Sequence, residues 1–175
     1  MLETMIKEIN RCMDNNCPIS ALSMALIIPD MCGKAEYPEC EKNKKRYVDW
    51  FDEWIGKYET YEGNEMPHLS GELVYSLRCS MFHEGKPTIN KGKFNLAKFS
   101  LFWSTKKDSF VFGGSSMAEV VDEKEGKRKL ENIVYEVNIR NLIFKICTCA
   151  EAYYKENKEK FNFLNYTIKN IDRLP

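Results

Sequence analysis

The segment from Leu73 to Gly85 constrains the fold more than any other part of the chain. At about 100° per residue, one arc of this segment is aliphatic, formed by Leu73, Val74, Leu77 and Met81. Tyr75 and Phe82 lie on roughly the opposite side. Ser70 is the expected N-cap of this helix, and Gly85 is expected to end it. Two apolar arcs on one helix predict contacts with the core of the domain and with a second surface.

The first 60 residues show further helical and loop patterns. Apolar residues at helical spacing predict a helix from Leu2 to about Asn15. Pro18 is expected to start a second helix that Pro29 terminates, because proline suits a first turn and interrupts a helix interior. The residues from Pro29 to Pro38 are predicted to form a loop. An aromatic stripe from Tyr47 to Tyr58 has helical spacing and is interpreted as core packing.

Between about residues 93 and 137 the apolar period changes to two, which is typical of strands. Strands are predicted at Phe94–Trp103, Phe110–Phe112 and Ile133–Val137. Asn138 is then expected to cap the last long helix, and the tail from Phe161 onward is apolar enough to dock on the body. The predicted fold is mainly α, a single domain over residues 1–175. Its helical body (1–86 and 138–175) carries a small antiparallel β-sheet, inserted before the last long helix.

Composition and charge argue against several classes of protein. Lys and Arg together number 26, as do Asp and Glu, so the net charge does not predict a polyanion-binding protein. No signal peptide is predicted, and the longest apolar run, residues 21–29, is too short to span a membrane. Seven cysteines without an export signal indicate free thiols in a reducing, cytoplasmic setting. No cofactor is expected. No metal is expected either, because C-x-x-C pairs are missing, although a composite site of Cys32, Cys40 and a histidine is conceivable.

Four residues separate Arg78 from His83 near the end of the predicted helix. This Arg78-x-x-x-x-His83 spacing resembles the R-x(4–6)-H signature of the HEPN superfamily, and the resemblance extends over about Leu69–Gly85. Members of that superfamily are compact helical bundles, often dimeric, and many are metal-independent ribonucleases of toxin–antitoxin and other defence systems. The resemblance implies an HEPN-like bundle, a homodimer, an RNA or nucleotide ligand and an antitoxin or other partner protein. It also implies that Arg78 and His83 are catalytic.

The chemistry of the two side chains suits RNA cleavage without a metal ion. Histidine transfers protons near neutral pH, and arginine binds phosphate through a planar fork that stays charged. One histidine cannot act as acid and base in the same step. His68, 15 residues before His83, would lie about 22 Å away along a single helix. The second histidine is therefore expected from a dimer mate, with Tyr75 and Phe82 at the contact.

Two other interpretations of the pair stay open. Cys79 follows the arginine where many active members have a polar residue, which favours a non-catalytic module that binds a nucleotide or a protein. Alternatively, the pair is structural, and Arg78 is neutralised by a carboxylate such as Asp30 or Glu84. An open cleft at Arg78 and His83 would favour the functional interpretations, whereas a pair sealed inside one protomer would favour the structural one.

Four auxiliary site residues are expected in addition to the pair. Asp30 and Lys34 are the first candidates, because they lie in a predicted loop after a core helix. Cys79 and Glu84 complete the set. Cys79 lies four residues before His83 and so on the same helical face. A buried structural thiol is favoured over a nucleophile, because a reactive cysteine usually lies at a helix N-terminus.

Overall fold

The computed structural model describes residues 1–59, 69–82, 90–91, 94–104, 115–117 and 133–164. The described part is mainly helical with a small sheet, as the sequence predicts at that level. Its elements follow in this order: α1 (Leu2–Asp14), α2 (Pro18–Ala25), α3 (Ile28–Glu36), α4 (Asn43–Trp54), the 3-10 helix η1 (Gly56–Tyr58), α5 (Gly71–Phe82), β1 (Asn90–Lys91), β2 (Phe94–Phe102), β3 (Ser115–Met117), β4 (Ile133–Asn138), α6 (Ile139–Glu156) and the 3-10 helix η2 (Lys158–Phe161).

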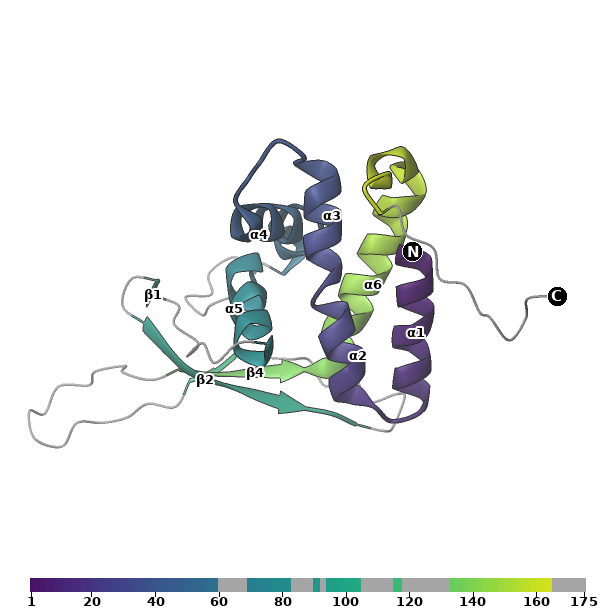
Figure 1. Cartoon of the computed structure of the whole chain (residues 1–175). Coiled ribbons are helices and arrows are strands. Elements are labelled where there is room, and N and C mark those ends of the chain that lie inside the picture. The colour runs from purple at the N-terminus through teal and green to yellow at the C-terminus, as the bar shows by residue number, and fades with distance from the viewer. Residues whose placement is uncertain (60–68, 83–89, 92–93, 105–114, 118–132, 165–175) are drawn as a thin grey trace, which may run out of the picture.

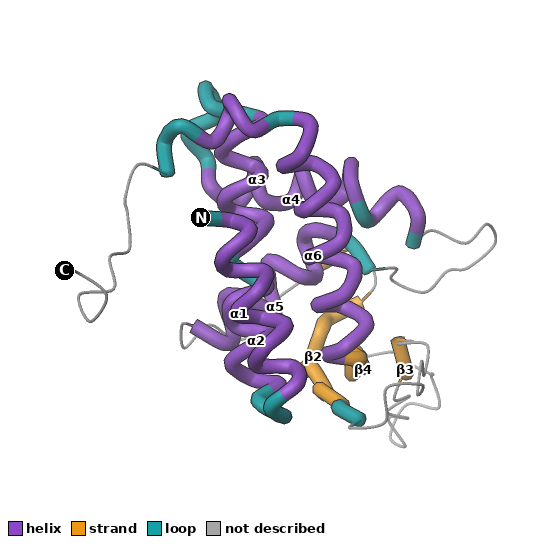
Figure 2. The backbone as a smooth tube through the Cα atoms, turned by 90° about the vertical axis from the view of Figure 1, so that its right-hand side faces the viewer, coloured by secondary structure: helices purple, strands orange, loops and turns teal. Residues whose placement is uncertain are grey.

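The helices pack on one another, and the strands lie together at one end of them (Figures 1 and 2). Helix α1 contacts α2 and α6, while α3 contacts α4 and α6. The largest fully buried side chains include Trp50 of α4 and Tyr153 of α6. Their rings meet edge to face with centroids 5.9 Å apart, a favourable aromatic geometry. The core therefore lies among the helices, and α6 is central to it.

The sheet differs from the prediction in the direction of its central pair. Its strand order is β1-β2-β4-β3, and β2 pairs with β4 in parallel, while the outer strands β1 and β3 are antiparallel to their neighbours. The expected antiparallel sheet is therefore wrong at its centre. Parallel neighbours need a connection of about a dozen residues or more, and 30 residues separate β2 from β4. The predicted strand at Phe110–Phe112 lies outside the described residues.

The predicted loop from Pro29 to Pro38 is wrong, because most of it is helix α3. Proline lacks a backbone N–H, but the N–H groups in the first turn of a helix have no acceptor within the helix. Pro29 therefore fits the first turn of α3. Gly33 also lies within α3. A Cβ at Gly33 would come 2.5 Å from the backbone oxygen of Arg46, so the glycine permits close packing of α3 on α4.

Several local predictions are confirmed. The hydroxyl of Ser70 accepts the N–H of Leu73 at 3.3 Å at the start of α5, and the Asn138 side chain accepts the N–H of Asn141 at 3.1 Å at the start of α6. Helix α1 agrees closely with the predicted segment. The aromatic stripe is largely packing, as predicted, although Tyr58 is exposed. Its fully buried members are Tyr47, Trp50 and Phe51.

The end of the described chain returns to the helices. Phe161 of η2 is buried, and its ring lies 5.8 Å from that of Tyr153. The beginning of the predicted docking tail thus packs on the body, whereas residues 165–175 lie outside the described part. Among the described helices, none has the length and apolar character needed to cross a membrane.

Candidate functional site on helix α5

Helix α5 is held against α4 at its first residue. The Gly71 N–H donates to the side-chain carboxylate of Asp52 at 2.6 Å. A Cβ at Gly71 would lie 2.6 Å from the backbone oxygen of Val48, so only glycine allows this close approach. The buried face of α5 carries Leu73, Val74 and Leu77. Together these contacts fix the direction in which the next turn presents Arg78.

Arg78 forms an ion pair across helices with Asp30 of α3. The Nε atom lies 2.8 Å from Oδ2 of the carboxylate, and the two side chains are 23% and 25% exposed. Burial raises the pKa of Asp30, and the facing guanidinium of Arg78 only partly offsets this effect. Burial also opposes the charge of Arg78, but Asp30 and two tyrosines more than compensate and raise the pKa of the guanidinium. The pair is neither sealed nor fully solvated.

Two tyrosines complete what we call the polar cluster, which consists of Asp30, Tyr47, Tyr75 and Arg78. The guanidinium carbon of Arg78 lies 5.6 Å from the ring centre of Tyr75, within the range of a cation–π contact. The Tyr75 ring in turn meets that of Tyr47 edge to face at 5.2 Å. The cluster thus joins α3, α4 and α5 at one point.

The hydroxyl of Tyr47 lies inside this cluster. Tyr47 is fully buried, and its hydroxyl has no hydrogen-bond partner among the described residues. Burial raises the pKa of this hydroxyl, and the negative charge of Asp30 adds to the effect. A buried polar group without a partner costs about 1–3 kcal/mol. The site therefore holds a charged pair and a polar group whose burial is costly.

The structure brings together only some of the predicted site residues. Asp30 contacts Arg78, the pairing that the structural interpretation foresaw. Lys34 does not join the cluster: its ammonium donates to the backbone oxygen of Pro38 at 2.9 Å and closes the end of α3. Cys79 is half-buried beside Tyr75, and together with burial it raises the pKa of the Tyr75 hydroxyl. His83 and Glu84 lie outside the described residues.

The predicted dimer contact consists of two side chains in different surroundings. Phe82, the last residue of α5, is 42% exposed. Tyr75 is only half-buried, but its ring already packs on Tyr47 and Arg78 of the same chain. Phe82 lies one turn after Arg78 on α5, and the Arg78 side chain is itself 23% exposed. The expectation of a homodimer stays a prediction.

Reasoning from sequence alone missed Tyr47 as a site residue. Its place in the aromatic stripe indicated core packing, and it is indeed in the core. Its contact with Tyr75 depends on how α4 crosses α5, for which the sequence gives only one signal. That signal is Gly71 at the start of α5, since a glycine there permits a close crossing.

A metal site finds no support in the described part of the chain. No group of three or more His, Cys, Asp or Glu side chains within it could hold a metal ion. Cys32, considered for a composite site, is fully buried, and burial raises the pKa of its thiol. The chemistry that the site offers is that of a fixed cation, a carboxylate and two phenols. The chain matched no family model, no curated protein and no solved structure with which it was compared.

Proposed function

We propose that the protein cleaves RNA without a metal ion, at a cleft where two copies meet around Arg78 and His83. The observation that carries the proposal is the placement of Arg78. Its guanidinium is fixed by Asp30 on one side and by the Tyr75 ring on another, one turn before the exposed end of α5. A cation held in this way is preorganised for a phosphate, because it loses little freedom on binding.

The proposed reaction is attack of a ribose 2′-oxygen on the neighbouring phosphorus. One His83 takes the proton of the 2′-hydroxyl as the new P–O bond forms. The His83 of the second copy gives a proton to the 5′-oxygen as the old P–O bond breaks. The products are a 2′,3′-cyclic phosphate and a 5′-hydroxyl. Arg78 stabilises the negative charge that develops on the phosphate oxygens.

In this proposal Asp30 positions Arg78 and does not touch the substrate. The ion pair brings Nε within 2.8 Å of the Asp30 carboxylate, although its N–H is not aligned for a hydrogen bond, so the phosphate would bind through the two terminal amino groups of Arg78. An arginine can face a carboxylate at one edge and a phosphate at the other, which a lysine cannot do. The proposal therefore requires arginine at this position, and Arg78→Lys is expected to lose most of the activity while the positive charge is kept.

The test is incubation of the purified protein with a mixture of RNAs in the presence of a chelator. Wild-type protein is expected to produce fragments that end in a 2′,3′-cyclic phosphate. His83→Ala is expected to lower the rate about 100-fold or more, the usual size of a lost proton-transfer group. His68→Ala, which removes the other histidine of the chain, is the matched control and should stay within about twofold of wild type. Equal cleavage by wild type and His83→Ala would refute the proposal.

A second candidate function is a non-catalytic module that binds a nucleotide or a protein through the same surface. The ion pair favours it, because Asp30 neutralises part of the charge that Arg78 would offer to a phosphate. The same samples separate the two candidates. Binding of RNA fragments by wild type, without cleavage and with loss of binding in Arg78→Lys, would support the module and exclude the nuclease.

A further inference from the structure

The turn that joins α1 to α2 brings two cysteines together. Helix α1 ends in a Schellman motif, in which Asn16 takes the left-handed conformation with a φ of 56°. The N–H of Asn16 donates to the backbone oxygen of Met13 at 3.3 Å. The N–H of Cys17 donates to the backbone oxygen of Cys12 at 2.8 Å. This second bond joins the two positions whose side chains commonly contact each other in the motif, and both are cysteines here.

The backbone hydrogen bond places the two cysteines within the range of a disulfide. With standard backbone dimensions, a distance of 2.8 Å from the Cys17 nitrogen to the Cys12 oxygen keeps the two Cα atoms within about 6.7 Å. Disulfides usually join Cα atoms that lie about 4.4–6.8 Å apart. In the free form, the Cys17 thiol donates to the backbone oxygen of Asn15 at 3.5 Å, a weak contact that rotation about the Cα–Cβ bond releases. A disulfide therefore requires a side-chain rotation and no large movement of the backbone.

The exposure of the two thiols is typical of a redox-sensitive pair. The structure describes all seven cysteines, and Cys17 is the exposed one among them. Cys17 is also the N-cap of α2, and reactive cysteines usually lie at helix N-termini. Cys12 is half-buried and packs against the core. An accessible thiol can meet an oxidant from solution, and a neighbouring thiol can then resolve the product.

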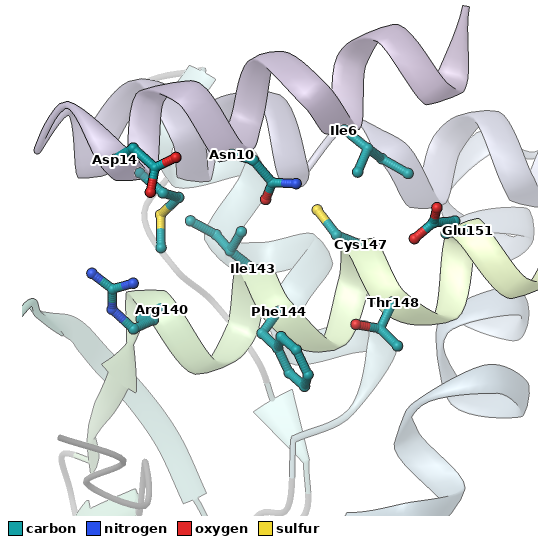
Figure 3. A pocket seen from close by; sticks show the side chains of 10 residues that line it. Ile6, Asn10, Asp14, Arg140, Ile143, Phe144, Cys147, Thr148 and Glu151 are labelled. Atoms are coloured by element: carbon teal, nitrogen blue, oxygen red, sulfur yellow. The ribbon is translucent and has the colours of Figure 1, made fainter. Parts of the chain in front are cut away.

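A third thiol near α1 is separated from this pair. Cys147 of α6 lines a groove to which Asn10 and Asp14 of α1 contribute, as Figure 3 shows. Cys12 follows Asn10 by about 200° around the helix, so it lies on another face of α1 and does not line this groove. Cys147 is also buried, and burial raises the pKa of its thiol to about 12, which suppresses the reactive thiolate. Cys17 is therefore the partner that the fold offers to Cys12.

We propose that Cys12 and Cys17 form a reversible disulfide in the presence of a small-molecule disulfide such as oxidised glutathione. The Cys17 thiolate attacks one sulfur of the oxidant, so that a mixed disulfide forms and one glutathione thiolate leaves. The Cys12 thiolate then attacks Sγ of Cys17, the bond between the two cysteines forms, and the second glutathione leaves. The two cysteines lose two electrons and two protons, and oxidised glutathione is reduced to two thiols. Excess reduced glutathione reverses both steps.

The fold is expected to favour this bond, because the turn holds the two cysteines close before the bond forms. In the unfolded chain the segment between Cys12 and Cys17 is free to adopt many conformations, and closing it into a loop costs chain entropy. Folding has already met this cost at the turn. By linkage, a disulfide that forms more readily in the folded protein also stabilises the fold, and this one would fix the end of α1 to the start of α2.

The test is equilibration of the full-length protein with glutathione buffers of increasing oxidised fraction, once folded and once in concentrated urea. Free thiols are then alkylated, and the disulfides are mapped by mass spectrometry. The equilibrium constant for the Cys12–Cys17 disulfide is expected to be at least about tenfold higher in the folded protein than in urea. The matched control combines Arg11→Cys with Cys12→Ser, which moves one thiol by a single residue to an adjacent face of α1. Its ratio of folded to unfolded constants should be at least about fivefold smaller, while its constant in urea changes little because the loop length hardly differs.

Three outcomes would overturn the proposal. A constant in the folded protein equal to or below that in urea would show that the turn does not bring the thiols together. An equal ratio for the control pair would show that general flexibility, and not the hydrogen-bonded turn, allows the contact. A product in which Cys17 joins two chains, detected as the main covalent species, would show that exposure alone governs its oxidation. The first comparison uses the wild-type protein alone, so it decides the question even where the control variant does not fold.

Discussion

Replacement of Asp30 by alanine measures how strongly the polar cluster joins α3 to α5. At an effective dielectric constant of about 20, unit charges about 3 Å apart attract by about 5–6 kcal/mol. Burial of roughly three quarters of each side chain removes much of this gain through lost hydration. Exposed pairs contribute about 0–1 kcal/mol, and breaking a fully buried pair costs about 3–5 kcal/mol. For a pair of intermediate exposure we expect Asp30→Ala to lower the free energy of unfolding by about 1–3 kcal/mol.

The assay is urea unfolding of wild type, Asp30→Ala, Arg78→Ala and the double variant, followed by circular dichroism. The two single changes should not add, because each removes the same interaction, and the coupling should be about 1 kcal/mol or more. Asp49→Ala is the control. It removes the partner of Lys45 in an exposed ion pair on α4 and should give no resolvable change. Additive effects of Asp30→Ala and Arg78→Ala would refute the reasoning, since the pair would then contribute nothing of its own.

Two further predictions concern the same cluster. Tyr47→Phe removes a buried hydroxyl without a described partner and keeps the ring, so the free energy of unfolding should stay within about 1 kcal/mol of wild type or rise, whereas Tyr47→Ala should lower it by about 3 kcal/mol or more. Loss of more than about 2 kcal/mol in Tyr47→Phe would show that the hydroxyl is bonded. Because burial raises the pKa of Asp30 in the folded state, its contribution to stability is largest below the unfolded pKa of about 3.9 and falls as the pH rises through the folded value. Wild type should therefore lose stability relative to Asp30→Asn between pH 4 and pH 7 in parallel urea titrations, and a constant difference would contradict the direction of the shift.

Local sequence signals were sufficient for the starts of α5 and α6 and for the class of the fold. Ser70 and Asn138 are N-caps because their side chains can accept a backbone N–H in the first turn, and this requires no knowledge of distant contacts. The alternation around Tyr135 likewise predicts a strand from neighbouring residues alone. The parallel pairing of β4 with β2 depends on the path of the 30 residues that connect the two strands. The residues within the strands do not determine that path.

Pro29 shows why the surroundings of Asp30 were harder to predict than the starts of α5 and α6. A proline followed by a glycine four residues later fits a loop, and it fits equally well the first turn of a helix that packs closely on a neighbour. The two cases differ only in the position of α4, whose Arg46 backbone lies against Gly33. Asp30 was therefore selected as an auxiliary residue for being in a loop, whereas it contacts Arg78 because it lies on a rigid helix.

The cost of the polar cluster bears on whether Arg78 is structural or functional. A partly buried ion pair stabilises a fold no better than apolar side chains of the same volume, and the buried hydroxyl of Tyr47 lowers stability further. Stability alone is therefore a weak reason for these residue types at the junction of three helices. The proposed role of Arg78, a cation held rigidly near the surface, would account for them, because Asp30 and Tyr75 both restrain its guanidinium. The unfolding measurements and the RNA-cleavage assay are independent. A strong coupling between Asp30 and Arg78 without any cleavage that depends on His83 would assign the cluster to folding. Coupling together with such cleavage would assign the same contacts to positioning Arg78 for a phosphate.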